Sequence, residues 1–66
     1  MKIIVNGIEK ECNDTTTLLE LLENLQLTGK VMAAAINMEI VKQDQWSSCI
    51  LKDGDKVELL DFVGGG

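Results

Sequence analysis

The chain ends in three consecutive glycines, Gly64, Gly65 and Gly66, which directly follow the strand-like run 56–63. Because glycine has no Cβ, such a segment can enter a cleft that is too narrow for any side chain. The carboxylate of Gly66 is then a group that the active site of another protein can hold and modify. Disorder also concentrates at chain ends, so the glycines alone fit an inert, frayed terminus equally well.

The chemistry open to the Gly66 carboxylate begins with activation, since a carboxylate anion is a poor electrophile with a poor leaving group. Transfer of AMP from ATP would make an acyl adenylate that a nucleophile can attack. If a persulfide supplies sulfur, the product is a C-terminal thiocarboxylate. Gly64 and Gly65 are the residues that we expect to insert into a narrow cleft that holds the nucleotide. The ATP belongs to the activating partner, and we expect no permanently bound cofactor.

The composition makes the chain itself a poor candidate for a catalyst. It has no histidine, which excludes Cys/His and Ser/His/Asp catalysis and most zinc sites. Cys12 and Cys49 lie far apart, without C-x-x-C spacing, and two reduced, partly buried thiols are the simplest interpretation. We therefore expect neither enzymatic activity nor a metal site, and any modification of the two cysteines is left open.

Length and charge narrow the class of protein further. The 66 residues, 45% of them apolar, suit one small domain. No apolar run approaches the roughly 18 residues that span a bilayer, and the first residues lack the pattern of a signal peptide. The net charge of −5 argues against nucleic-acid binding and favours a basic protein partner. A cytoplasmic protein without membrane contact is the default expectation.

A β-hairpin is predicted at the start of the chain. Asn6-Gly7 suits a type I′ turn between strands 2–5 and 8–12, because both turn residues accept a positive φ. Strand alternation then sets the two faces of the first strand: Ile3 and Val5 on one, Lys2 and Ile4 on the other.

A helix is predicted after the hairpin. Thr17 and Glu20 have the spacing of a capping box, and Thr28-Gly29 supplies the stop. Four leucines recur at helical spacing and form one apolar stripe that faces the core: Leu18, Leu21, Leu22 and Leu25.

The second half of the chain predicts further strands. A strand over 31–37 is followed by a short edge strand at 40–41, a helical turn around Trp46, a turn at 53–55 and a last strand at 56–62. Trp46 is interpreted as a lid on a small core. In the strand at 31–37, alternation places Met32, Ala34 and Ile36 on one face and Ala33 and Ala35 on the other. In the last strand, Val57 and Leu59 face inward.

This order of elements predicts an α+β fold of the β-grasp, or ubiquitin-like, type. A mixed sheet of four to five strands carries one main helix on one face. Short, right-handed connections let the last strand run parallel beside the first. Residues 1–63 form the single domain in this interpretation, and residues 64–66 form a flexible glycine tail that leaves the end of a central strand.

Apolar residues on the outer sheet face predict where a partner docks. Leu60 and Phe62 stand on the face of the last strand that should be polar if it met only solvent. Ile4 joins them if the first and last strands are neighbours, and Ala33 and Ala35 extend the patch at its flank. An apolar surface with an acidic rim is typical of a protein interface. Coverage by the chain's own loops, or by a second copy, is the alternative.

Over essentially its whole length the chain resembles the thiamine-biosynthesis sulfur carriers, the ThiS family of small β-grasp proteins. The resemblance rests on five features together: the early hairpin, Ala35-Ile36-Asn37, Ile40-Val41 followed by Trp46, the Asp53-Gly54-Asp55 turn and the Gly65-Gly66 end.

The resemblance implies three protein partners. An ATP-dependent, ubiquitin-activating-like (ThiF-like) enzyme would adenylylate Gly66, and a cysteine desulfurase system would supply the sulfur. Thiazole synthase (ThiG-like) would take that sulfur for the thiazole ring of thiamine. Many relatives carry Pro-Arg where this chain has Lys42-Gln43, so a rigid turn is lost while Lys42 keeps some positive charge. Gly64 also extends the diglycine by one residue.

Three alternatives remain open at this point. The small subunit of molybdopterin synthase shares the terminal chemistry, although those chains are usually longer. A ubiquitin-like modifier would end in an isopeptide bond to a lysine. A non-catalytic interaction domain would carry inert glycines.

Overall fold

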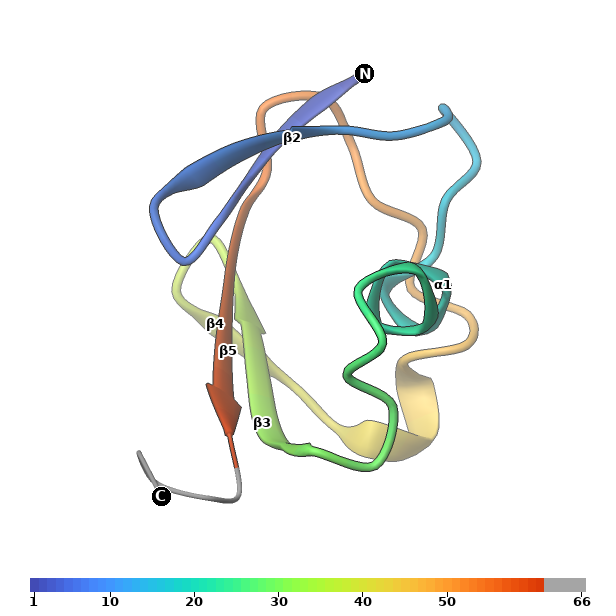
Figure 1. The fold of residues 1–66 in the computed structure, drawn as a ribbon, viewed down its shortest axis with the longest axis vertical. Coiled ribbons are helices and arrows are strands. Elements are labelled where there is room, and N and C mark those ends of the chain that lie inside the picture. Colours follow the sequence, from blue (N-terminus) through green and yellow to red (C-terminus); the bar gives the residue numbers. More distant parts are fainter. Residues whose placement is uncertain (62–66) are drawn as a thin grey trace.

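The computed structural model describes residues 1–61, which form one sheet and one α-helix (Figure 1). The helix lies across one face of the sheet, and no helix of the described residues covers the other face (Figure 1). In chain order the elements are β1 Lys2–Val5, β2 Ile8–Glu11, α1 Leu18–Asn24, β3 Val31–Ile36, β4 Glu39–Val41, a 3-10 turn at Gln43–Gln45 and β5 Lys56–Asp61.

The sheet is mixed and has the strand order β2-β1-β5-β3-β4. The first and last strands are parallel neighbours at its centre, and the remaining pairs are antiparallel. The mixed sheet and the parallel pairing of the first and last strands were predicted from the order of elements, and the β-grasp prediction is confirmed. β1, at the start of the chain, is therefore paired with β5, the strand that leads to the carboxyl end.

The first hairpin forms as the sequence predicts. Asn6 has a φ of 49° and Gly7 a φ of 85°, the two left-handed values of a type I′ turn. Val5 pairs with Ile8 across that turn, and every residue of β2 is exposed. β2 ends at Glu11, one residue before the predicted end at Cys12.

Helix α1 begins at the predicted capping box. The Thr17 hydroxyl accepts the Glu20 backbone N–H at 3.1 Å, and the Glu20 carboxylate accepts the Thr17 N–H at 2.9 Å. These bonds satisfy two amides that the first helical turn would leave unpaired. None of the helices in residues 1–61 has the length and apolarity needed to cross a membrane.

The predicted end of the helix at Thr28-Gly29 is wrong, because α1 already ends at Asn24. Gln26 adopts a left-handed φ of 59°, and its N–H donates to the Glu23 carbonyl at 3.0 Å. The next N–H, from Leu27, donates back to the Leu22 carbonyl at 2.8 Å. This pair of bonds is a Schellman motif, formed here without the glycine that usually marks it.

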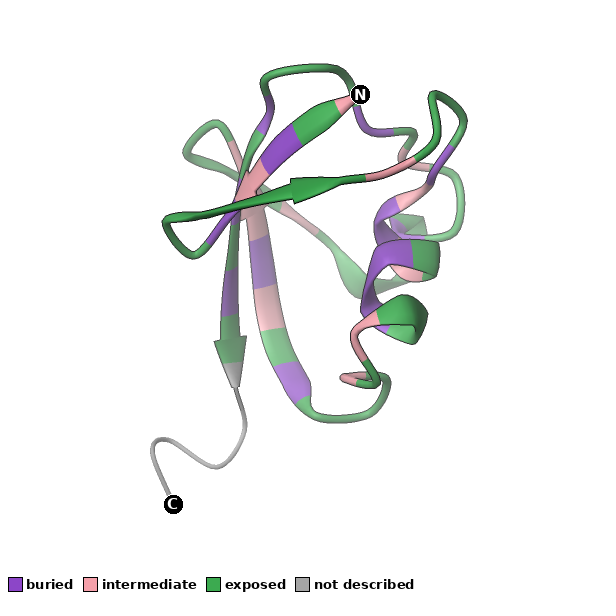
Figure 2. Ribbon diagram, turned by 45° about the horizontal axis from the view of Figure 1, so that its top comes forward, coloured by how far each residue is buried: buried purple, intermediate pink, exposed green. Residues whose placement is uncertain are grey.

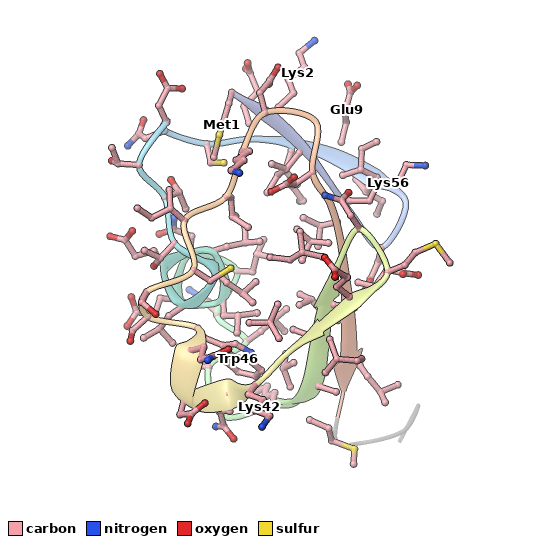
Figure 3. The ribbon with its side chains drawn as sticks, turned by 180° about the vertical axis from the view of Figure 1, so that it is seen from behind. Met1, Lys2, Glu9, Lys42, Trp46 and Lys56 are labelled. Atoms are coloured by element: carbon pink, nitrogen blue, oxygen red, sulfur yellow. The ribbon has the colours of Figure 1, made fainter. Side chains whose placement is uncertain are left out.

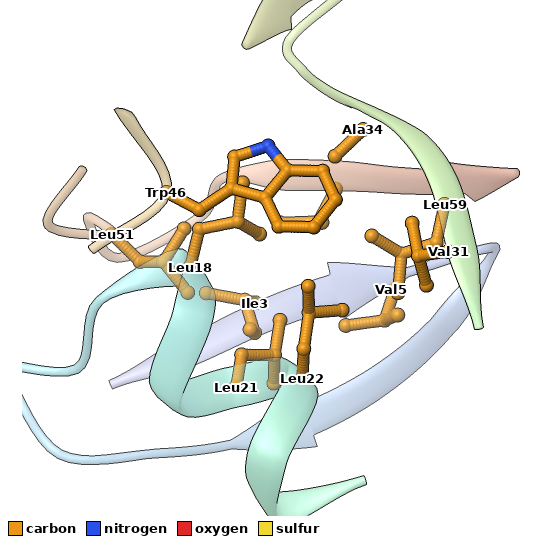
Figure 4. Packing of buried hydrophobic residues seen from close by; sticks show 11 residues of the cluster. Ile3, Val5, Leu18, Leu21, Leu22, Val31, Ala34, Trp46, Leu51 and Leu59 are labelled. Atoms are coloured by element: carbon orange, nitrogen blue, oxygen red, sulfur yellow. The ribbon is translucent and has the colours of Figure 1, made fainter. Parts of the chain in front are cut away.

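The core fills the space between α1 and the inner face of the sheet (Figures 2 and 4). Trp46 is only 4% exposed, and its indole Nε1–H donates to the Val41 carbonyl at 2.9 Å. Its interpretation as a lid on the core is therefore confirmed. The buried apolar residues come from β1, α1, β3, β5 and the segment between β4 and β5: Ile3, Val5, Leu18, Leu21, Leu22, Val31, Ala34, Trp46, Leu51, Val57 and Leu59.

A register shift in β3 corrects one predicted face. Alternation grouped Met32 with Ala34, yet Ala34 is buried and Met32 is 53% exposed. The β3–β5 pairing is irregular between Val31 and Ala33, so Val31 takes the inward position instead. Such a bulge adds one residue to a strand and reverses the facing of the residues before it.

Candidate functional site

Strand β5 connects the core to the carboxyl end of the chain, and its two faces differ as predicted. Val57 and Leu59 point inward and are 0% and 9% exposed, whereas Leu60 is 59% exposed on the outer face. Phe62 and the glycines Gly64, Gly65 and Gly66 lie outside the described residues, so the roles assigned to them stay predictions. The domain boundary at residue 63 also lies outside them.

Three of the predicted docking residues meet on the outer face. Ala33 lies opposite Leu60 in the β3–β5 ladder, and Ala35 lies opposite Glu58. Neither alanine is large enough to cover its neighbours, so the surface is hollowed here. The residues that line this shallow depression are Asn6, Ala33, Ala34, Ala35, Ile40, Glu58, Leu59 and Leu60.

Ile40 belongs to this surface but was absent from the predicted patch. It pairs with Ala35 across β3 and β4, and its side chain is 74% exposed. Alternation in the short edge strand could have found it, because the neighbouring Val41 is half-buried against the core. We call the outer-face residues Ala33, Ala35, Ile40 and Leu60 the apolar patch.

Ile4 lies on the same outer face but apart from the apolar patch. The parallel register sets Ile4 beside Lys56, four residues before Leu60 on β5. At a rise of about 3.3 Å per residue, that separation is roughly 13 Å along the strand. Ile4 instead lines a second depression, together with Gly7, Met38, Lys56, Val57 and Glu58.

Charged groups lie at both ends of the sheet. Lys56 and Glu9 are at the end where β5 begins, whereas Lys42 is at the end toward which β5 runs (Figure 3). Glu58 lines both depressions and separates Ile4 from the apolar patch. Lys30 also belongs to this end of the sheet, because it precedes Val31, which pairs with Asp61 at the end of β5.

The two cysteines are free and half-buried, as expected. Burial raises the pKa of the Cys49 thiol above its ordinary value of 9.0, and the nearby Asp55 carboxylate raises it further. Cys49 is therefore held as a neutral thiol, which is a weak nucleophile. Asp55 is itself occupied, since it accepts the Lys52 N–H at 2.8 Å and the Asn37 amide at 3.0 Å.

Among residues 1–61, no group of three or more acidic, cysteine or histidine side chains is placed to hold a metal ion. What this part of the chain offers is an exposed apolar patch on the outer face of the sheet, beside the strand that leads to the carboxyl end.

A five-stranded mixed sheet with parallel central strands and one helix on one face defines a β-grasp domain of the ubiquitin-like class. A family model described as the ThiS family matches residues 3–66. The sulfur carrier protein ThiS of Escherichia coli is 38% identical over 66 residues, and the match covers all of both chains. The chain belongs to the ThiS family.

Two further relatives extend this result. The crystal structure of the thiamine biosynthesis protein ThiS from Geobacter metallireducens has a TM-score of 0.82 and 31% identity, and the two chains cover each other completely. A thiazole synthase from Paramagnetospirillum magneticum is 35% identical over 66 residues. Our chain spans only 20% of the length of that thiazole synthase.

Proposed function

We propose that this chain carries sulfur, as a thiocarboxylate on Gly66, to the enzyme that forms the thiazole ring of thiamine. The observation that carries the proposal is the full-length similarity to a protein named as a sulfur carrier, 38% identical over all of both chains. The chain is in this account a substrate carried between enzymes of the cytoplasm, and it catalyses no step itself.

The proposed chemistry has three steps. An oxygen of the Gly66 carboxylate attacks the α-phosphorus of ATP, which forms the acyl adenylate and releases pyrophosphate. The terminal sulfur of an enzyme persulfide, loaded by a cysteine desulfurase, attacks the acyl carbon and displaces AMP. A second thiol then cleaves the resulting acyl disulfide, so that the thiocarboxylate leaves and a disulfide forms between the two thiols.

The folded body must dock for these steps to occur on a short tail. Ordering each tail residue costs about 1–2 kcal/mol, and glycines offer little contact in return. The apolar patch lies beside the strand that leads to the tail, and Leu60 is 59% exposed within it. We place the ThiF-like activating enzyme on this face, with Lys42 at the same end of the sheet (Figure 3).

The proposed acceptor of the sulfur is a thiazole synthase of the ThiG type. A protein named thiazole synthase contains a segment similar to all 66 residues of this chain, which makes up 20% of its length. A carrier-like segment within the same chain as its acceptor is an economical arrangement, because linkage raises the effective concentration of one for the other.

Two assays on the full chain test the proposal. ATP–pyrophosphate exchange with the activating enzyme of the same host should depend on this chain, and should stop when one alanine is appended after Gly66. Expression in a strain that lacks its own thiamine sulfur carrier should restore growth without thiamine. Rescue of molybdenum-cofactor synthesis in its place would assign the chain to the other sulfur-carrier pathway, and exchange by the extended chain would contradict the tail chemistry.

A further inference from the structure

Strand β5 continues beyond the strand that supports it on one side. β1 pairs with β5 only at Ile4–Lys56 and Val5–Val57, and β1 then ends. β5 runs on through Asp61 toward the carboxyl end. On its other side β3 stays paired as far as the Val31–Asp61 pair. Among the described strands, none flanks β5 on the β1 side after Val57.

The side chain of Asn6 occupies the place where the next rung of that ladder would be. Its backbone N–H donates to the Val57 carbonyl at 2.9 Å, which is the last backbone bond of the series. Its carboxamide Oδ1 then accepts the Leu59 N–H at 2.8 Å, and its Nδ2 donates to the Leu59 carbonyl at 3.4 Å. A carboxamide carries the same donor and acceptor as a peptide group, so Asn6 replaces one residue of a missing strand.

Only a few residues can serve both parts of this arrangement. Asn6 sits at a φ of 49°, a left-handed value that asparagine tolerates better than most side chains. Glycine would accept that backbone at least as well but has no carboxamide. Aspartate would keep the acceptor for the Leu59 N–H and lose the donor to the Leu59 carbonyl.

We propose that Asn6 is a positioning residue for the carboxyl terminus: it holds the second half of β5 in extended form so that the glycine tail enters the activating site already aligned. This inference rests on the proposed function and assigns Asn6 no contact with ATP. Ordering a strand before binding lowers the entropy lost on docking. The gain applies equally to the bound ground state and the transition state, so it lowers KM and leaves kcat unchanged.

Asn37 provides a matched control within the same strand. It too lies in a hairpin turn at a left-handed φ, 52°, and its Oδ1 accepts a β5 backbone N–H, that of Lys56 at 3.0 Å. Lys56 begins β5, at the end away from the tail. Asn37→Gly therefore removes the same kind of bond from the opposite end of the strand.

The experiment compares three variants of the full chain with the activating enzyme, using ATP–pyrophosphate exchange. Asn6→Gly should raise KM for the carrier about 5- to 10-fold at unchanged kcat, and Asn37→Gly should change it less than about twofold. The KM of the Asn6→Asp variant should lie between those of the wild type and of Asn6→Gly. Equal effects of the two glycine variants, or a loss confined to kcat, would overturn the proposal.

Amide hydrogen exchange on the free carrier supplies the second readout, because it needs no partner. The Leu59 amide should exchange faster in Asn6→Gly and stay protected in Asn6→Asp, while the Lys56 amide should respond only to Asn37→Gly. A raised KM without faster exchange of the Leu59 amide would mean that Asn6 contacts the enzyme directly, and would overturn the proposed positioning role.

If Asn6→Gly fails to fold, Asn6→Asp becomes the deciding variant. A folded aspartate variant with an unprotected Leu59 amide would overturn the proposal. If the wild-type chain supports no ATP–pyrophosphate exchange by the activating enzyme, that result would instead contradict the proposed function.

Discussion

Ala33 lies directly opposite Leu60 on the outer face of the sheet, in neighbouring antiparallel strands. A larger residue at position 33 would cover the leucine, because the side chains of such a cross-strand pair are in contact. The alanine instead leaves Leu60 59% exposed, one residue before β5 ends at Asp61. This pair places an apolar contact surface close to the carboxyl end of the chain.

Replacement of Leu60 by serine should weaken binding of the activating enzyme about tenfold. The expected loss is about 1–2 kcal/mol, since an anchoring side chain at an interface is removed. Ile8→Ser is the matched control, because Ile8 is 61% exposed and lies on β2, away from the apolar patch. Titration calorimetry measures both affinities. Equal weakening by the two variants would argue against a docking role for the patch.

Replacement of Trp46 by alanine should unfold much of the population. The indole is 4% exposed, and loss of a buried aromatic side chain costs about 3–5 kcal/mol. A domain of this size has a total stability of only about 3–5 kcal/mol. Trp46→Phe should cost less, about 1 kcal/mol beyond the change in volume, through the lost bond to the Val41 carbonyl. Urea unfolding followed by far-UV circular dichroism tests both, and an unchanged midpoint in Trp46→Ala would contradict the lid role.

Replacement of Met38 by glycine should stabilise the domain by about 0.5–1 kcal/mol. Met38 follows Asn37 in a turn and has a φ of 71°, a left-handed value that strains a residue with a long side chain. The side chain is 89% exposed, so its removal costs little burial. The converse change, Gly7→Met, meets no atom within 4 Å of a Cβ at φ +85°, so its expected cost is backbone strain alone. Opposite shifts in the urea midpoint are predicted, and shifts of the same sign would contradict this account.

The raised pKa of Cys49 predicts a loss of stability in alkaline solution. Burial, and then the Asp55 carboxylate, favours the neutral thiol in the folded state, whereas the unfolded thiol ionises near its ordinary value of 9.0. Between that value and the higher folded pKa, the folded state binds more protons than the unfolded state, so stability falls as pH rises. Cys49→Ala should flatten this part of the stability profile measured by urea unfolding. If the stability of Cys49→Ala falls equally steeply as the pH rises, the pH dependence belongs to other titrating groups.

Local signals in the sequence predicted the local structure well. Asn6-Gly7 specifies its turn through the φ values that both residues accept, and Thr17 with Glu20 specifies its cap through two side-chain bonds. The end of α1 was missed because Gln26 takes a left-handed φ without being glycine. Glycine is the residue that usually marks such a helix end, and glutamine gives no comparable signal in the sequence.

Long-range register was harder to obtain from the sequence. Alternation correctly placed Ile4 and Leu60 on the outer face, but it could not say how far β1 extends along β5. That register depends on where each strand begins within the folded sheet, and it separates Ile4 from the apolar patch. Met32 was misplaced for a similar reason, since a bulge depends on pairing with a strand far away in sequence.

The most direct test of the account is the intact mass of the chain purified from its native host while the desulfurase pathway is active. A fraction should be heavier than the encoded chain by the difference between one sulfur and one oxygen, and fragmentation should place that difference on Gly66. A population that remains unmodified, although the activating enzyme and ATP are present, would contradict the carrier function. Chains joined through Gly66 to lysines of other proteins would contradict it as well.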